Sequence, residues 1–194
     1  SDISNQQALE FFGCVVTSFS ITAEAGTDGG QYKWSATLMT GKKPDLASTA
    51  SPTITAYATT DIPKLSSSSG HKVFNVNVIL SSFTTSIESP AVFTGVASDG
   101  YQVVSRGAEI AVTADAQVKY DGNTKGFINS FDTQSAALSG NLFVITNDNA
   151  FGMDMQNGVF TNVALAEGDL MMLDCSIKSV DDGTDALVTF DVSA

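Results

Sequence analysis

The sequence predicts an all-β, mainly antiparallel fold of the β-sandwich or barrel type, with one short helix. Hydrophobic residues alternate with polar ones at a period of two along most of the chain, which is typical of half-buried strands. The segments are separated by turn-forming stretches such as "GTDGGQ" and "DDGTD". Several short strands joined by such turns favour two packed sheets.

Two N-terminal segments predict a β-hairpin. Residues 14–23 and 32–38 each place apolar side chains on one side and mostly Ser, Thr or Lys on the other. Between them, Asp28 and Gly29 are residue types that can adopt the positive φ angles of a tight turn. We therefore expect these two strands to pair.

The span 40–70 predicts a long loop or mobile arm, because it is rich in Ser, Thr, Pro and Ala. The stretch "PTITAYAT" inside it has the composition of a short strand. Lys42 and Lys43 lie in "TGKKP", which lacks the preceding glycine and the following Ser or Thr of a nucleotide-binding loop. We interpret both lysines as solvated loop charges.

The middle of the chain contains the strongest strand prediction. Residues 72–88 predict a strand with a break near Ser81 and Ser82, and an Asp-Gly turn at Asp99 precedes a strand at 101–106. After Gly107, residues 109–120 alternate cleanly, and at roughly 3.3 Å per residue this strand is about 35 Å long. One face is polar and must meet water or a polar partner. Its members are Glu109, Thr113, Asp115, Gln117 and Lys119.

One helix is predicted within "DGNTKGFINSFDT", where Phe127, Ile128 and Phe131 form a stripe after the candidate caps Asn123 and Thr124. We expect this helix to plug a sheet. Further strands are predicted at 137–147, 152–166, 170–180 and 186–193. A chain of this length fits one domain spanning residues 1–194.

The net charge of the chain limits the classes of partner that it can bind. The formal net charge is −12, from 21 acidic and 9 basic residues, so phosphate binding is disfavoured because it requires clustered Lys and Arg. The acidity fits solubility, adaptation to salt, or a surface that lies near an anion without binding it. No apolar run approaches the roughly 18 residues of a spanning helix. The first residues lack a signal peptide's basic leader and apolar segment.

The chain offers few residues for chemistry. The single histidine, His71, follows "SSSSG", and we expect it at the surface rather than in a catalytic group. Cys14 and Cys175 are distant in sequence, and the apolar neighbours of Cys175 favour a buried thiol over a disulfide. The acidic stretches "VDDGTD" and "NDNAFGMD" lack the calcium-loop pattern and predict turns. We expect no cofactor and no metal, and we expect the protein to function by assembling with other copies.

Two long segments resemble the tail tube proteins of long-tailed bacteriophages. "FFGCVVTSFSITAEAGTDGGQYKWSATLMTGKKP" is similar to a strand pair of that family with the pattern G-C/A-V-V-x-S-x-x-(I/L)-x-A-E-x-G. "SSFTTSIESP" and "VSRGAEIAVTADAQVKYDGNTKGFINSF" resemble its strand, arginine-glycine kink, long strand and short helix. The resemblance covers most of residues 11–131, and its motifs are fold signatures rather than catalytic ones.

The resemblance implies a β-sandwich flanked by a helix, six copies of which form a ring through an inter-subunit β-barrel. Stacked rings would form the virion tail tube, assembled in the host cytoplasm, through which DNA passes without specific binding. The tape measure and other tail proteins would be partners. The polar face of residues 109–119 would then line the channel, and an acidic lumen would repel phosphates.

Arg106 is the only arginine of the chain. Under the same resemblance it is a candidate inter-subunit contact, because a planar guanidinium suits a carboxylate across a boundary. Lys42 and Lys43 are further candidates for such contacts. The alternative for Arg106 is a pair with Glu109 or another acid of its own subunit.

Three classes of function remain after these observations. A structural virion protein is the leading hypothesis. The alternative is a secreted β-sandwich binding module or surface-filament subunit, which the acidic, Ser- and Thr-rich composition also suits. An enzyme is third, because no residue cluster supports one.

Overall fold

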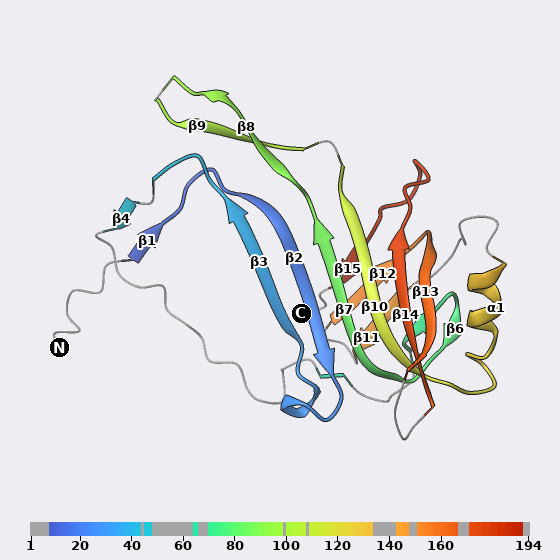
Figure 1. The fold of residues 1–194 in the computed structure, drawn as a ribbon. Coiled ribbons are helices and arrows are strands. Elements are labelled where there is room, and N and C mark those ends of the chain that lie inside the picture. Colours follow the sequence, from blue (N-terminus) through green and yellow to red (C-terminus); the bar gives the residue numbers. More distant parts are fainter. Residues whose placement is uncertain are drawn as a thin grey trace, which may run out of the picture.

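A computed structural model of the chain describes residues 8–43, 45–47, 64–65, 70–98, 100–107, 109–133, 143–147, 151–166 and 171–191. These residues form an all-β sandwich of two antiparallel sheets with one α-helix, as the alternation predicts (Figure 1). No barrel closes within the described part of the chain. Two short strand pairs extend beyond the sandwich.

The larger sheet has six strands, and all of its neighbouring strands are antiparallel. In spatial order they are β13 (Gly158–Ala166), β14 (Met172–Ser179), β10 (Ala111–Lys119), β7 (Leu80–Glu88), β2 (Val15–Glu24) and β3 (Lys33–Met39). The predicted N-terminal hairpin is thus confirmed as β2–β3, and Asp28 (φ 49°) and Gly29 (φ 69°) have the positive angles expected of its turn.

The smaller sheet packs against the apolar face of the larger one. Its order is β15 (Thr189–Asp191), β12 (Phe151–Met155), β11 (Phe143–Asn147), β5 (Lys72–Val73) and β6 (Val76–Asn77). The rings of Phe83, from β7, and Phe143, from β11, lie 6.1 Å apart and join the two layers. The buried core continues through Val112 and Val118 on β10 and Met155 on β12.

Helix α1 (Gly126–Asp132) closes one end of the sandwich (Figure 1). Phe127 is buried, and its ring lies 5.5 Å from that of Phe160 on β13. The predicted helix is confirmed, but its predicted caps are wrong. The side chain of Asp121 instead accepts hydrogen bonds from the backbone N–H groups of Asn123 (2.8 Å) and Thr124 (3.3 Å) and so shapes the turn before the helix.

The predicted break near Ser81 and Ser82 is confirmed as a register irregularity inside β7, where Ser82 pairs with Gln117 and Leu80 with Val118, so that Ser81 is an extra residue. The chain reverses earlier, at Phe74 (φ 48°) and Asn75 (φ 63°), which form a two-residue turn between β5 and β6. Two consecutive positive φ angles are typical of a tight hairpin turn. Phenylalanine rarely adopts this conformation, so the sequence carried no turn signal there.

The segment 152–166, predicted as one strand, is divided between the two sheets. β12 ends at Met155 and β13 begins at Gly158, and the chain crosses between layers at Gln156 and Asn157. The backbone oxygen of Asn157 accepts hydrogen bonds from the N–H of Val180 (3.0 Å) and the hydroxyl of Ser179 (3.1 Å). Both strands alternate, so periodicity alone did not reveal the crossing.

The predicted loop 40–70 contains structure that the composition did not indicate. Strand β4 (Asp45–Ala47) pairs with β1 (Ala8–Glu10), and Lys64 forms an isolated bridge with Gln31. Leu65 is buried and donates its backbone N–H to Gly30 at 2.6 Å. The stretch 52–59, where a short strand was predicted, lies outside the described residues.

The surface position predicted for His71 is wrong, because only 1% of this residue is exposed. Its backbone oxygen accepts a hydrogen bond from the N–H of Val78 at 3.0 Å. The short β5–β6 hairpin folds onto the core with Val73 and Val78 buried. His71 is carried inside with them, although the preceding Ser-rich sequence indicated a loop.

The larger sheet is irregular near the start of β2, the end of β7 and the connection that leads to β10, and we call this region the bend. Thr17 is an extra residue in β2, and its carbonyl accepts a hydrogen bond from the N–H of Ser89 at 2.8 Å. On the next connection, the N–H of Gly107 donates to the carbonyl of Pro90. Beyond this bend, β8 (Ala91–Val96) and β9 (Gln102–Arg106) pair with each other alone and project past β2 and β3 (Figure 1). We call residues 91–106 the outer ribbon.

We predict that Gly107→Ala destabilises the base of the outer ribbon. A Cβ at position 107 would lie 2.8 Å from the carbonyl oxygen of Pro90 and 3.2 Å from its Cβ, and relieving such a backbone clash costs about 1–3 kcal/mol. Gly122→Ala is the control, because a Cβ there meets nothing within 4 Å. Urea unfolding should show a lower free energy of unfolding for Gly107→Ala alone. Equal values for the two variants would contradict a required glycine at the bend.

Candidate functional site

The face of the larger sheet that points away from the core is polar over five of its six strands, whereas the edge strand β13 contributes only Asn162 to it, beside Val159, Ala164 and Ala166. The pattern is set by β10, in which even-numbered residues from Val112 to Val118 are buried and odd-numbered ones are wholly or partly exposed. The strand registers place side chains of neighbouring strands beside them. This polar face comprises Ser18, Ser20, Thr22, Glu24, Lys33, Ser35, Thr37, Ser82, Thr84, Ser86, Glu88, Thr113, Asp115, Gln117, Lys119, Asn162, Asp174, Ser176 and Lys178.

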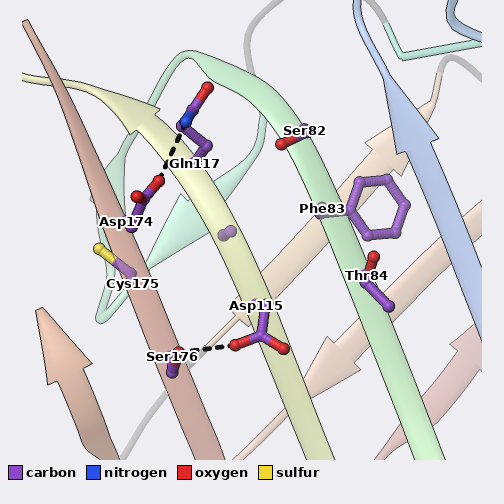
Figure 2. Close-up of a pocket in the computed structure, with 9 residues that line it drawn as sticks. Ser82, Phe83, Thr84, Asp115, Gln117, Asp174, Cys175 and Ser176 are labelled. Atoms are coloured by element: carbon purple, nitrogen blue, oxygen red, sulfur yellow. Dashed lines mark hydrogen bonds between the residues drawn. The ribbon is translucent and has the colours of Figure 1, made fainter. Parts of the chain in front are cut away.

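Cross-strand hydrogen bonds connect many of these side chains. The hydroxyl of Ser176 donates to Asp115 Oδ1 at 2.6 Å, and Gln117 Nε2 donates to Asp174 Oδ1 at 3.0 Å (Figure 2). On the other half of the sheet, the hydroxyls of Thr22 and Thr84 lie 3.0 Å apart. Directly opposed residues on one face of an antiparallel pair interact in this way. The polar face is therefore an ordered network rather than a set of independent surface side chains.

The deepest part of this network is a shallow depression of about 190 Å³ between β7, β10 and β14 (Figure 2). Ser82, Thr84, Asp115, Gln117 and Ser176 line it with hydroxyl, amide and carboxylate groups. These groups can bind water or a polar partner.

Cys175 borders the same depression without supplying a nucleophile. Its side chain is on the core side of β14 and is buried. Burial and the charge of Asp174 raise the pKa of its thiol to about 12, and a thiol rather than a thiolate is unreactive. The predicted buried thiol is confirmed, and neither Cys14 nor Cys175 is in a disulfide.

The charges of the polar face nearly cancel. Its acids are Glu24, Glu88, Asp115 and Asp174, and its bases are Lys33, Lys119 and Lys178, so four negative and three positive charges leave a net charge of −1. The whole chain carries −12. The expected acidity is thus concentrated elsewhere, and this face is dominated by neutral hydroxyl and amide groups.

The structure brings four of the five candidate lumen residues onto this one face. Thr113, Asp115, Gln117 and Lys119 alternate along β10 with buried neighbours. Glu109 precedes the strand and is exposed, and it lines a separate depression with Ile110 and Lys178. The sequence pattern identified the facing of β10, but the partners on β7 and β14 required the strand order.

Arg106 lies at the base of the outer ribbon, opposite Ala91 on β8. Its side chain is exposed and forms no ion pair or hydrogen bond with any described residue. In particular, the pair with Glu109 that the sequence left open is not formed. The guanidinium is therefore available to a group outside the described part of this chain.

Lys42 and Lys43 are placed differently from each other. The Lys42 Nζ lies 5.0 Å from the centre of the Tyr101 ring at the tip of the outer ribbon, a cation–π distance. A Cβ at the neighbouring Gly41 would fall 1.8 Å from the carbonyl oxygen of Gln102, so the two backbones are in direct contact there. Lys43 is exposed. Lys42 thus connects the end of β3 to the ribbon within one chain.

The remaining acidic groups serve local structure. Asp182 Oδ1 accepts hydrogen bonds from the backbone N–H groups of Thr184 (2.9 Å) and Asp185 (3.0 Å), and these bonds lower the pKa of its carboxyl. The prediction that "VDDGTD" is a turn is confirmed, whereas residues 148–150 of "NDNAFGMD" lie outside the described residues. Within the described ranges, no group of His, Cys, Asp or Glu is arranged to hold a metal ion.

Burial raises the pKa of the Asp154 carboxyl. It lies in the smaller sheet, where Gln156 Nε2 donates to its Oδ2 at 2.7 Å. That hydrogen bond and the charge of Lys72 act in the opposite direction, as does any opposite charge near a carboxylate. Asp154 is remote in strand order from the polar face, so it adds nothing to that surface.

Comparison with known proteins yields no match, either among protein-family models or among curated proteins. The described residues include no helix long and apolar enough to cross a membrane.

Proposed function

We propose that this protein is a structural virion protein, the subunit of a phage tail tube whose rings stack into a DNA-conducting channel. The observation that carries the proposal is the polar face, which covers five neighbouring strands of the larger sheet, from β14 to β3, while the smaller sheet packs behind it. If the larger sheets of several copies formed the curved wall of a channel, their polar faces would contact the water inside it. The packed core of each subunit would support the wall from behind.

The two edges of the larger sheet support assembly. β13 and β3 are its outermost strands, and each pairs with only one neighbour in the described part of the chain. Unpaired edges are templates for pairing with another chain, and closure of a barrel removes them. Six copies joined side by side would form a closed wall, which agrees with the resemblance of the sequence to tail tube proteins.

The chemistry of the polar face suits passage of DNA. Hydroxyl and amide groups that already bond to one another have little tendency to hold a phosphate, and the three lysines are offset by four carboxylates. Binding of DNA requires uncompensated cations, whose contacts release counterions. A nearly neutral wall would neither bind DNA tightly nor exclude it. The tape measure and other tail proteins would be further partners in the virion.

We expect the purified protein to form six-fold rings, or tubes made of such rings, as its concentration rises. Edge strands and an extended polar face favour a closed cyclic assembly. Sedimentation velocity together with negative-stain electron microscopy measures the outcome. Open fibres without rings would support the surface-filament alternative, and a monomer at all concentrations would contradict the proposal.

We expect Asp115→Lys to preserve folding and assembly but to slow DNA release from the virion. The substitution changes the net charge of the polar face from −1 to +1, because one of four acids becomes a fourth base. A ring of cations attracts phosphates, and added salt weakens that attraction. Asp132→Lys is the control, since it makes the same charge reversal on exposed helix α1. Release that is equally fast in both variants would argue against a lumenal position for β10.

We expect Arg106→Ala to weaken assembly without lowering the melting temperature of the isolated subunit. The side chain has no partner among the described residues, so its loss removes no contact of the folded chain that the structure shows. An inter-subunit carboxylate partner would contribute about 2–5 kcal/mol if the pair is buried and about 1 kcal/mol or less if it is exposed. The measurement is the critical concentration for ring formation of Arg106→Ala. Lys125→Ala is the control, because it removes an exposed cation next to α1. A lower melting temperature with unchanged assembly would make Arg106 an internal strut.

A further inference from the structure

The outer ribbon exposes apolar side chains on both of its faces. Phe93 and Val104 oppose each other on one face, and Val92 lies opposite Ser105 on the other. Half of Phe93 and 69% of Val96 remain exposed in the single chain. A two-stranded ribbon is marginally stable by itself in water, so a ribbon of this composition needs a surface to pack on.

A second apolar surface lies on the core side of β2 and β3, where the smaller sheet ends. The last strand of that sheet, β15, reaches only as far as Phe19, whose ring meets that of Phe190 at 6.1 Å. Beyond this contact β3 overhangs the sandwich. Trp34 stacks on Phe19 at 6.5 Å and is 73% exposed, and Leu38 is 57% exposed. We call Val16, Phe19, Trp34 and Leu38 the open-sheet patch.

The charge distribution indicates that the occupant of both surfaces is a second copy of this chain. Two copies with a net charge of −12 repel each other over most of their surfaces. The outer ribbon contains only Asp99 and Arg106 as charged residues, and the open-sheet patch contains none. Depletion of charge with enrichment of aromatic residues is typical of the core of a protein interface. Contact between these two surfaces therefore brings copies together where repulsion is least.

The shapes of the two surfaces set the symmetry of the contact. One is a projecting ribbon and the other an overhanging sheet face, so they are complementary to each other rather than to themselves. The ribbon of a chain does not cover the patch of the same chain, since Trp34 and Leu38 stay exposed. A contact between different surfaces of identical chains is heterologous and generates a ring or a filament.

We infer that the outer ribbon of one copy packs on the open-sheet patch of the neighbouring copy. This inference rests on the proposed tube function and names the apolar contact that holds its subunits together. Each chain donates one ribbon and receives one.

Photo-crosslinking tests the contact directly. Phe93 is replaced by benzoylphenylalanine in the full chain, and the protein is assembled from equal parts of normal and heavy-nitrogen-labelled subunits. Cross-linked peptides of mixed isotope composition come only from two different copies. We expect them to join position 93 to β2 or β3 near Val16, Trp34 or Leu38. Cross-links confined to one chain, or to another surface of the second copy, would overturn the inference. The same probe at the exposed Ile79 is the control.

Substitution separates this inference from the proposed function. Phe93→Ser and Trp34→Ser should each raise the critical concentration for assembly by about tenfold, the effect of losing one well-buried apolar contact. The double variant should be less than additive, because both changes remove one contact. Ile79→Ser should change it by less than about twofold, since its exposed side chain belongs to neither surface. Monomer melting temperatures verify folding in each case.

The outcomes of these experiments distinguish the ribbon contact from the tube proposal. Rings whose critical concentration is unchanged by Phe93→Ser and Trp34→Ser would overturn the ribbon contact and leave the tube proposal standing. Open fibres that depend on both residues would support the ribbon contact and overturn the tube. A wild-type protein that stays monomeric at all concentrations would overturn both.

Discussion

The two-sided alternation of the larger sheet is the constraint on which the structure depends. Each of its strands points one side chain in two to the core side of the sheet, so a register slip of one residue would exchange the two faces on that strand. The register shifts by one residue at three places, in the β2–β3, β7–β10 and β13–β14 pairs. The buried apolar side chains stay continuous across these shifts. The core and the polar face are thus two products of one pattern.

The carboxylates of the polar face take part in its hydrogen-bond network. Asp115 and Asp174 each accept a hydrogen bond from a side chain of a neighbouring strand, and both are exposed. Activated catalytic groups are usually found where burial or like charges perturb them. The one strongly perturbed group beside the face, the thiol of Cys175, lies on the core side and is inactive.

Local pattern was sufficient to predict the fold class, the β2–β3 hairpin, the facing of β10 and the helix at Phe127. Local pattern did not predict the features that depend on contacts between distant parts of the chain. Phe74 adopts a positive φ that its residue type disfavours, and the crossing at Asn157 interrupts no alternation. His71 is buried by a hairpin that follows it. The cross-strand partners of Asp115 depend on strand order, which a single sequence does not encode locally.

The exposure of apolar side chains on β3 could also not be predicted from the sequence. Trp34 and Leu38 occupy core-type positions of a strand and would be counted as buried by periodicity alone. Among the described residues, the smaller sheet ends at the short edge strand β15, and both side chains are exposed beyond it. An apolar residue on the correct face of a strand is therefore buried only where a second layer extends over it.

The bend at Thr17, Pro90 and Gly107 divides the molecule into parts of unequal cooperativity. The outer ribbon is joined to the sandwich by two chain connections and by the contacts of Gly41 and Lys42 with Gln102 and Tyr101, and it contributes no residue to the buried core. Its amide hydrogens are consequently protected by the ribbon's own pairing rather than by global folding, so they exchange with solvent through local opening. If a second copy covers the ribbon, as we infer, the exchange of these amide hydrogens should slow while that of the sandwich core stays unchanged.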